Sequence, residues 1–231
     1  MTSSPIIINY PFPSEKANAE KVLASLPGTV KSIIVEADIS TADGPSMLAG
    51  KAAAEFGKID ILVNNAGISM LSVLDTPDDA DFEKTWNTVL GVNGRGTLFL
   101  TRAVLKHLSR QHSRIINICS STSRNPDPNM TIYAGTKGMV ESFTRCWARD
   151  LPRKYGCTVN TVAPGPINTE AMRAAPRELH ELLEKSYDRV PVASRMAEPE
   201  EIAWTVAMLC EEKAGWLNGL YVPVTGGSTI I

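Results

Sequence analysis

Short apolar runs rich in isoleucine and valine alternate along the chain with longer segments that have the polar and apolar pattern of helices. This alternation predicts a parallel sheet wrapped by helices on both faces, an α/β fold. The predicted strands lie at residues 6–9, 32–36, 59–64, 114–119, 158–162 and 220–224. The predicted helices lie at residues 16–26, 47–56, 81–109, 132–154, 177–187 and 199–210.

The composition is that of a globular enzyme domain. The 231 residues are 43% hydrophobic and 21% charged, so we expect one core and a single domain over residues 1–231. A formal charge of −2 without a basic stripe argues against nucleic acid and against anionic membrane surfaces as partners. No apolar run reaches the roughly 18 residues of a membrane span and no signal pattern is recognised, so a cytoplasmic location is expected.

Cysteine and histidine spacing gives no indication of a metal site. The four cysteines show no CxxC spacing, which argues against a disulfide framework or a zinc cluster, and we expect buried free thiols. The three histidines are scattered among charged helical sequence, where exposed positions are more common than metal ligands.

Three residues suggest chemistry at a carbonyl or an alcohol. Tyr133 and Lys137 are four apart in a predicted helix and therefore share one face, and Ser120 follows an apolar strand thirteen residues upstream of Tyr133. An ammonium beside a phenol favours the phenolate, provided burial does not cancel the effect, and a nearby hydroxyl can bind the same substrate oxygen. By itself the Tyr–Lys pair is as well explained by a ring packed on a lysine stem.

Further segments in the same order give these residues a context. They are NNAG at residues 64–67, Val-Asn-Gly at 92–94, and the stretch at 159–169 that contains a Pro-Gly turn. Together with Ser120 and the Tyr-x-x-x-Lys pair they resemble the short-chain dehydrogenase/reductase family over nearly the whole chain. The resemblance implies a Rossmann-like doubly wound sheet and oxidoreductase activity on a small carbonyl or alcohol substrate.

The chain departs from that family at its start. The family begins with a strand, a TGxxxGxG loop and a helix, whereas residues 5–10 resemble its second strand, so the first strand-loop-helix unit of roughly 30 residues is missing. We expect weaker cofactor binding, and either unpaired strand edges or a direct pairing of the flanking strands. An incomplete gene model is an alternative explanation. The GxxGxG at residues 91–96 lies within a predicted helix and is not expected to bind phosphate.

The resemblance implies a role for each matching residue. Tyr133 would be the general acid in carbonyl reduction, Lys137 would lower its pKa and hold the nicotinamide ribose, and Ser120 would orient the substrate oxygen. Asn93 would hold a water linked to Lys137. Other positions that match the cofactor contacts of the family are Asp38 and Ile39 at the adenine, Asn65, Ala66 and Gly67 under the adenosine ribose, and Ile167 and Thr169 beside the carboxamide.

Cofactor choice depends on the end of the second strand. Members that use NAD generally carry an aspartate there, whose carboxylate repels a 2′-phosphate, whereas this chain has Asn9. This favours NADP, as in the fungal polyhydroxynaphthalene reductases, to which the chain has a local likeness. The same likeness suggests a ketone of secondary metabolism as the substrate.

Two other functions are compatible with the residues. One is a cofactor-independent isomerase, dehydratase or cyclase that uses Ser120, Tyr133 and Lys137 as acid and base groups, and the other is a non-catalytic oligomer partner. Because helices of this family commonly pair across two-fold axes, we expect a homodimer or homotetramer. Residues 169–198 are expected to form either a mobile lid or a solvated amphipathic helix.

Overall fold

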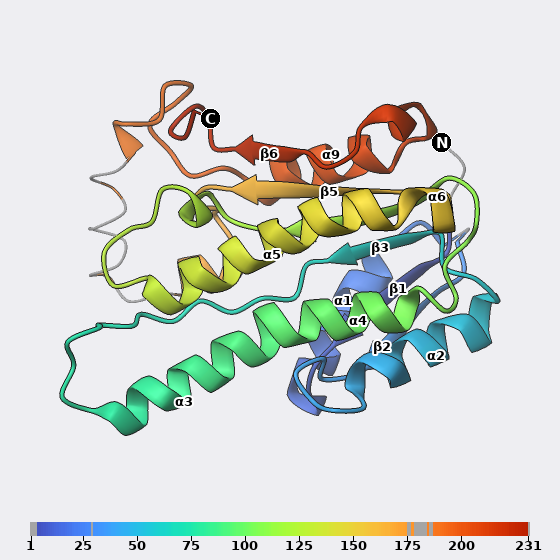
Figure 1. The fold of residues 1–231 in the computed structure, drawn as a ribbon, viewed down its shortest axis with the longest axis horizontal. Helices are drawn as coiled ribbons and strands as arrows, with labels where there is room; N and C mark the ends of the chain where they lie inside the picture. Colours follow the sequence, from blue (N-terminus) through green and yellow to red (C-terminus); the bar gives the residue numbers. More distant parts are fainter. Residues whose placement is uncertain (1–3, 29, 175–176, 178–183, 185–186, 231) are drawn as a thin grey trace.

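The computed structural model describes residues 4–28, 30–174, 177, 184 and 187–230 (Figure 1). Its strands are β1 (Ile6–Tyr10), β2 (Ser32–Glu36), β3 (Ile61–Asn64), β4 (Ser113–Ile118), β5 (Cys157–Pro164) and β6 (Tyr221–Val224). Its helices are α1 (Lys16–Ser25), α2 (Gly44–Phe56), α3 (Asp79–Val89), α4 (Thr97–Val104), α5 (Thr131–Asp150), α6 (Pro152–Tyr155), α7 (Glu170–Arg173) and α9 (Pro199–Cys210). Short helical segments are the 3-10 turns η1 (Pro13–Glu15), η3 (Ser121–Ser123) and η4 (Glu212–Trp216), and the π-helix η2 (Leu90–Gly96).

All strand pairs are parallel, and the predicted α/β class is confirmed. The order β3-β4-β5-β6 forms one sheet, and β1 pairs with β2 in a second. Within the described ranges β1 and β3 do not pair, so one edge of each has no strand partner. Of the two outcomes expected without the first family unit, unpaired edges are the one observed.

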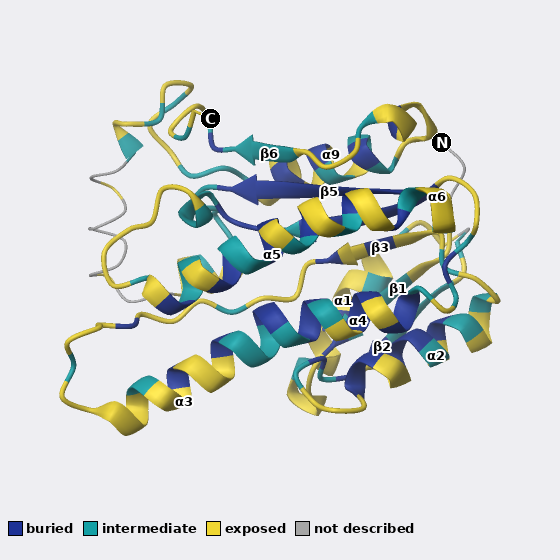
Figure 2. Cartoon of the chain, in the orientation of Figure 1, coloured by how far each residue is buried: buried dark blue, intermediate teal, exposed yellow. Residues whose placement is uncertain are grey.

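Apolar residues fill the space on both faces of the sheets. One cluster joins β2, β3, β4 and β5 to α2, α4 and α5, and the other joins β4 and β5 to α9. Figure 2 shows β5 buried along its whole length, as expected for a central strand covered by helices on both sides. In Figure 1, α2, α4 and α5 lie in front of the strands and α9 lies behind β5 and β6.

The long predicted helix at residues 81–109 is present as three consecutive helical segments, α3, η2 and α4. The π-helix between them contains the GxxGxG sequence, which therefore lies in a helix as expected and is not a phosphate loop. Close packing explains two of its glycines. A Cβ at Gly96 would lie 2.8 Å from the Ile39 side chain, and one at Gly94 would lie 2.9 Å from Leu90 Cδ1.

Most other element predictions agree with the structure to within a few residues. Strand β3 is shorter than predicted, because Ile59 forms only an isolated bridge with Leu108. The predicted helix at 177–187 lies largely outside the described residues. Cys119 and Cys157 are buried as expected and Cys210 is half-buried, but the expectation was wrong for Cys146, which is exposed. None of the described helices is long and apolar enough to cross a membrane.

Candidate active site

The carboxyl ends of the parallel strands meet at one side of the molecule, on the left in Figure 1. Strand β3 leads there into residues 65–67, β4 into Ser120, and β5 into residues 165–169, and the first turns of α5 lie beside them. Open α/β sheets bind ligands at this edge, because the loops that follow parallel strands converge there. The edge therefore brings together segments far apart in the sequence.

Ser120, Tyr133 and Lys137 form a cluster at this edge. Tyr133 and Lys137 lie one helical turn apart on α5, with the Lys137 Nζ 5.7 Å from the centroid of the Tyr133 ring. The Ser120 hydroxyl accepts two bonds from Thr122, and it lies near enough to the Tyr133 phenol to lower the pKa of that phenol. Ser120 and Lys137 are 8% and 5% exposed, so the phenol is bordered by two shielded polar groups.

Burial controls the acidity of this cluster. It raises the pKa of Tyr133, an effect that the nearby Ser120 hydroxyl only partly offsets. Burial also lowers the pKa of Lys137. The expectation that Lys137 would bring the phenol toward the phenolate is wrong in net direction. The physical reason is that desolvation dominates and the Lys137 ammonium donates to the Ile118 carbonyl at 2.9 Å.

Asn93 holds the segment after β3 against the cluster. Its side-chain amide donates to the Ile68 carbonyl at 2.9 Å and to the Thr136 hydroxyl at 3.1 Å, and its Oδ1 accepts from the Ile68 N–H at 2.9 Å. A Cβ at Gly67 would lie 3.2 Å from the Lys137 Nζ and 3.4 Å from the Asn93 Oδ1. Gly67, Asn93 and Lys137 are therefore in close contact. The role of Asn93 in holding a water stays a prediction.

The residues predicted for the adenine end lie at the carboxyl ends of β1 and β2. The Asn9 amide donates to the carbonyls of Val35 and Ala37, at 3.1 and 2.9 Å, and so ties β1 to β2. Asp38 Oδ1 accepts from the Ser40 N–H at 2.9 Å, and Ile39 is buried in the core. These side chains have structural partners of their own, and their contacts with a cofactor stay predictions.

The remaining predicted residues lie on two loops of the same edge. Asn65 and Ala66 are exposed directly after β3. Ile167 pairs with Ala197 in an isolated bridge, and the Thr169 hydroxyl accepts from the Met172 N–H at 3.1 Å, which caps α7. Thr169 thus has a helix-capping function in addition to any contact with a carboxamide.

A dinucleotide fits this arrangement at one end. Tyr133 and Lys137 offer donors for a nicotinamide and its ribose, and the Asn65–Gly67 turn beside Lys137 is exposed. For the pyrophosphate, the described segments contain no glycine-rich turn between a strand and a helix start. Such a turn normally supplies the N–H groups that bind the two phosphates.

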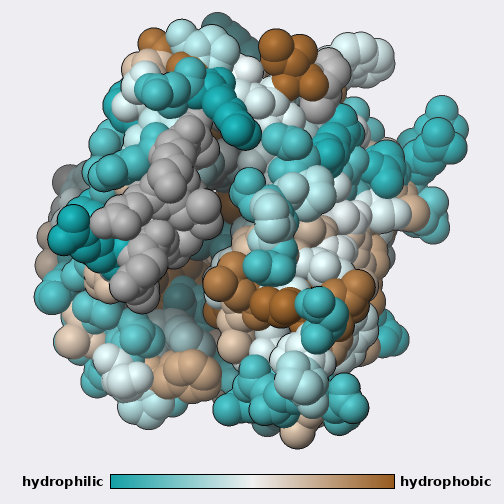
Figure 3. All heavy atoms as spheres, turned by 90° about the vertical axis from the view of Figure 1, so that its left-hand side faces the viewer, coloured by the Kyte–Doolittle hydropathy of each residue, from teal (hydrophilic) through white to brown (hydrophobic). Residues whose placement is uncertain are grey.

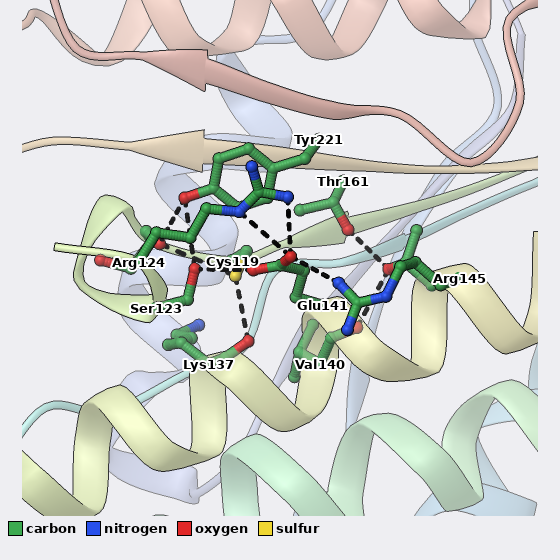
Figure 4. A network of polar contacts seen from close by, with 11 residues as sticks. Cys119, Ser123, Arg124, Lys137, Val140, Glu141, Arg145, Thr161 and Tyr221 are labelled. Atoms are coloured by element: carbon green, nitrogen blue, oxygen red, sulfur yellow. Dashed lines mark hydrogen bonds and ion pairs between the residues drawn. The ribbon is translucent and has the colours of Figure 1, made fainter. Parts of the chain in front are cut away.

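Sequence reasoning missed a group of polar residues behind Ser120 (Figure 4). The group is centred on Glu141, whose carboxylate contacts Ser123, Arg124 and Arg145. Tyr221 of β6 donates to the Ser120 carbonyl at 3.1 Å. One signal was present, since Glu141 follows Lys137 by four residues and so continues the face of Tyr133 and Lys137.

Known proteins resemble this chain over almost its full length. A family model described as enoyl-(acyl carrier protein) reductase matches residues 5–229. The short-chain dehydrogenase/reductase FrzI of Cladobotryum sp is 34% identical over 96% of this chain and 85% of its own length. Versicolorin reductase stcU of Emericella nidulans is 33% identical over 96% and 85%. A crystal structure of a gluconate 5-dehydrogenase from Burkholderia cenocepacia, in complex with NADP and tartrate, superposes with a TM-score of 0.82 at 27% identity, covering 99% of this chain and 96% of that one.

Proposed function

Because the chain belongs to the short-chain dehydrogenase/reductase family, we propose that it is an NADP(H)-dependent oxidoreductase that reduces a ketone, or oxidises the corresponding secondary alcohol. The observation that supports this most strongly is the cluster of Ser120, Tyr133 and Lys137 at the carboxyl edge of the sheet. We further propose that residues 1–231 act as one domain.

The cluster suits proton donation to a carbonyl oxygen. Ser120 and Tyr133 would both bind the substrate oxygen, and Tyr133 would donate its proton as the alkoxide forms. Its raised pKa keeps the phenol protonated at neutral pH, which favours the role of an acid. Lys137 would hold the ribose of the nicotinamide, and the bound cofactor would supply the hydride.

NADP is the better candidate cofactor because Asn9 carries no charge at the end of β1. A carboxylate at this place would repel the 2′-phosphate of NADP, whereas a neutral amide does not. The Asn9 amide also keeps the ends of β1 and β2 together through the Val35 and Ala37 carbonyls. The related gluconate 5-dehydrogenase was crystallised with NADP, which is consistent with this choice.

The substrate is proposed to be an apolar ketone. Apolar side chains are exposed in the segment that follows the Gly67 turn, among them Leu71 and Leu74 at 66% and 73%. This segment is tied to the start of α5, since the Ser72 hydroxyl accepts from the Ile132 N–H at 3.0 Å, next to Tyr133. Figure 3 shows apolar side chains gathered on this side of the molecule. The fungal versicolorin reductase among the relatives supports a substrate of secondary metabolism.

Cofactor and turnover measurements test the proposal together. We expect the chain to reduce apolar cyclic ketones with NADPH, with kcat/KM at least about 10-fold higher than with NADH. The reason is that a missing or repelled contact at the 2′-phosphate changes the binding free energy by roughly 1–3 kcal/mol. Calorimetry should give weak NADPH binding, because the described residues supply no glycine turn for the pyrophosphate. NADH preferred over NADPH would contradict the cofactor assignment. Turnover of a substrate without either cofactor would favour an isomerase, dehydratase or cyclase instead.

A homodimer or homotetramer is also proposed. Of the apolar residues on α5 and α9 and at the C-cap of α4, Trp204 is 69% exposed, whereas Leu105, Trp147 and Met208 pack partly against the chain's own core. Light scattering at micromolar concentration is expected to give a multiple of 25.0 kDa. A monomer would contradict this prediction, and it would direct attention to the unpaired edges of β1 and β3.

A further inference from the structure

An ion-pair network around a buried carboxylate adjoins the proposed catalytic cluster, and the reaction proposed above makes no use of it (Figure 4). Its centre is the Glu141 carboxylate, which is 8% exposed. Arg124 reaches Glu141 Oε1 through both Nε and Nη2, at 3.1 and 2.8 Å, and Ser123 donates to Oε2 at 3.1 Å. Arg145 also contacts Oε1, at 2.5 Å.

The network connects the two halves of the proposed catalytic cluster. Glu141 lies on α5 one turn beyond Lys137 and two turns beyond Tyr133, so the three side chains leave the helix on one face. Ser123 and Arg124 belong to the turn η3 and its C-cap, and this turn begins immediately after Ser120. The bonds from Glu141 therefore fix the distance between the element that carries Ser120 and the helix that carries Tyr133.

A second attachment reaches Ser120 from β6. The Tyr221 hydroxyl on β6 donates to the Ser120 carbonyl at 3.1 Å and lies 3.2 Å from the Ser123 hydroxyl. The Arg124 guanidinium covers the Tyr221 ring at 3.9 Å from its centroid. Arg124 thus binds Glu141 and packs on Tyr221 at once, which limits the positions open to the η3 turn.

Glu141 is charged in this environment. Burial acts to raise its pKa, but the bonds from Arg124 and Ser123 and the charges of Arg124 and Arg145 lower the pKa in total. Removing one partner of a buried carboxylate that binds two arginines and a hydroxyl lowers stability strongly, because it leaves buried charge that is no longer fully paired. Such a network is a rigid attachment rather than a surface ion pair.

We propose that Glu141 is a positioning residue for the reductase reaction: through Arg124 and Ser123 it holds the η3 turn against α5, so that the Ser120 hydroxyl stays beside the Tyr133 phenol. The inference rests on the proposed function for its kinetic consequence only. The geometric part, the bonds between Glu141 and the η3 turn, exists without substrate or cofactor.

The chain offers a matched control for this role. Arg124 and Arg145 both bind Glu141 Oε1, but Arg145 lies on α5 itself, four residues after Glu141, and does not connect the helix to the η3 turn. Arg124→Met and Arg145→Met remove the same charge from the same carboxylate. Only the first removes bonds between Glu141 and the η3 turn that follows Ser120.

The ionisation of Tyr133 distinguishes positioning from plain electrostatics. The groups that act on this phenol are Ser120 and Cys119 at the end of β4, and Lys137 lies beside it on α5. Because Ser120 lowers the pKa of Tyr133, moving the Ser120 hydroxyl away should raise this pKa, whereas removing the negative charge of Glu141 by itself should lower it. Glu141→Gln therefore gives opposite signs under the two explanations.

The experiment measures the Tyr133 pKa by NMR of protein labelled with 13C at tyrosine Cζ, the signal being assigned by its loss in Tyr133→Phe. We expect Glu141→Gln and Arg124→Met to move this pKa upward by roughly half to one pH unit, and Arg145→Met to leave it near the wild-type value. In kinetic assays the first two variants should lower kcat roughly 10- to 100-fold with KM for NADPH changed less than about 2-fold.

Specific outcomes overturn the proposal. A folded Glu141→Gln protein whose Tyr133 pKa falls or stays unchanged would show that Glu141 does not position Ser120. Equal effects of Arg124→Met and Arg145→Met would lead to the same conclusion. If Glu141→Gln fails to fold, the two arginine variants decide the question, since both side chains are partly exposed. Absence of NADPH-dependent turnover in the wild type would contradict the proposed function, while the NMR comparison would still test the positioning role.

Discussion

Tyr133→Phe is expected to lower kcat roughly 10²- to 10⁴-fold, the usual contribution of a positioned general acid. The substitution removes one oxygen atom, the only group in the cluster that is both a proton donor at neutral pH and one turn from Lys137 on α5. Ser120 would still bind the substrate oxygen, so we expect KM to change much less than kcat. Steady-state kinetics with NADPH and an apolar ketone provide the measurement.

Tyr155→Phe is the control for this substitution. Tyr155 lies on α6, where the Arg110 guanidinium covers its ring at 4.6 Å from the centroid. Helix α6 follows the carboxyl end of α5, whereas Tyr133 lies near the amino end of α5. The same loss of a hydroxyl should leave kcat within about 2-fold of wild type, as for surface changes away from a site. If Tyr133→Phe retains the wild-type circular dichroism spectrum and wild-type turnover, Tyr133 is not the acid.

Arg114→Leu is expected to lower the free energy of unfolding by roughly 2–4 kcal/mol, because it removes the bonds of a buried guanidinium to three backbone carbonyls. Arg114 is 1% exposed on β4 and points toward α9. Its guanidinium donates to the Ser113 carbonyl at 3.0 Å and to the Glu211 and Glu212 carbonyls at 2.9 and 3.3 Å. A cation at the carboxyl end of α9 also complements the helix dipole.

Urea unfolding followed by tryptophan fluorescence measures this loss. Arg149→Leu, an exposed arginine near the end of α5, is the control and should change the free energy of unfolding by less than about 0.5 kcal/mol. Equal stability of the two variants would mean that the Glu211 and Glu212 carbonyls find other donors. In that case the buried guanidinium contributes no net stability to the end of α9.

The parts of the site that come from local sequence were predictable. Tyr133 and Lys137 lie on one face because a helix repeats every 3.6 residues, and Ser120 follows a strand whose apolar run was evident. The Glu141 network was not predictable. Ser120 and Tyr221 are 101 residues apart, and Arg124 and Glu141 are 17 apart on different elements. Only the packing of β6 and η3 against α5 brings these side chains together.

The sequence by itself determined the alternation of strands and helices, the family and the helical spacing of the proposed acid, because hydrophobic periodicity and short motifs are local properties of the chain. Tertiary structure decided the electrostatics of the site. Burial at the carboxyl edge raises the pKa of Tyr133, and the Ile118 carbonyl accepts the Lys137 ammonium, so spacing alone gave the wrong sign. Tertiary structure also decided that β1 and β3 do not pair with each other. Strand pairing depends on which strand edges come within hydrogen-bonding distance when the chain packs, and no local sequence pattern encodes that.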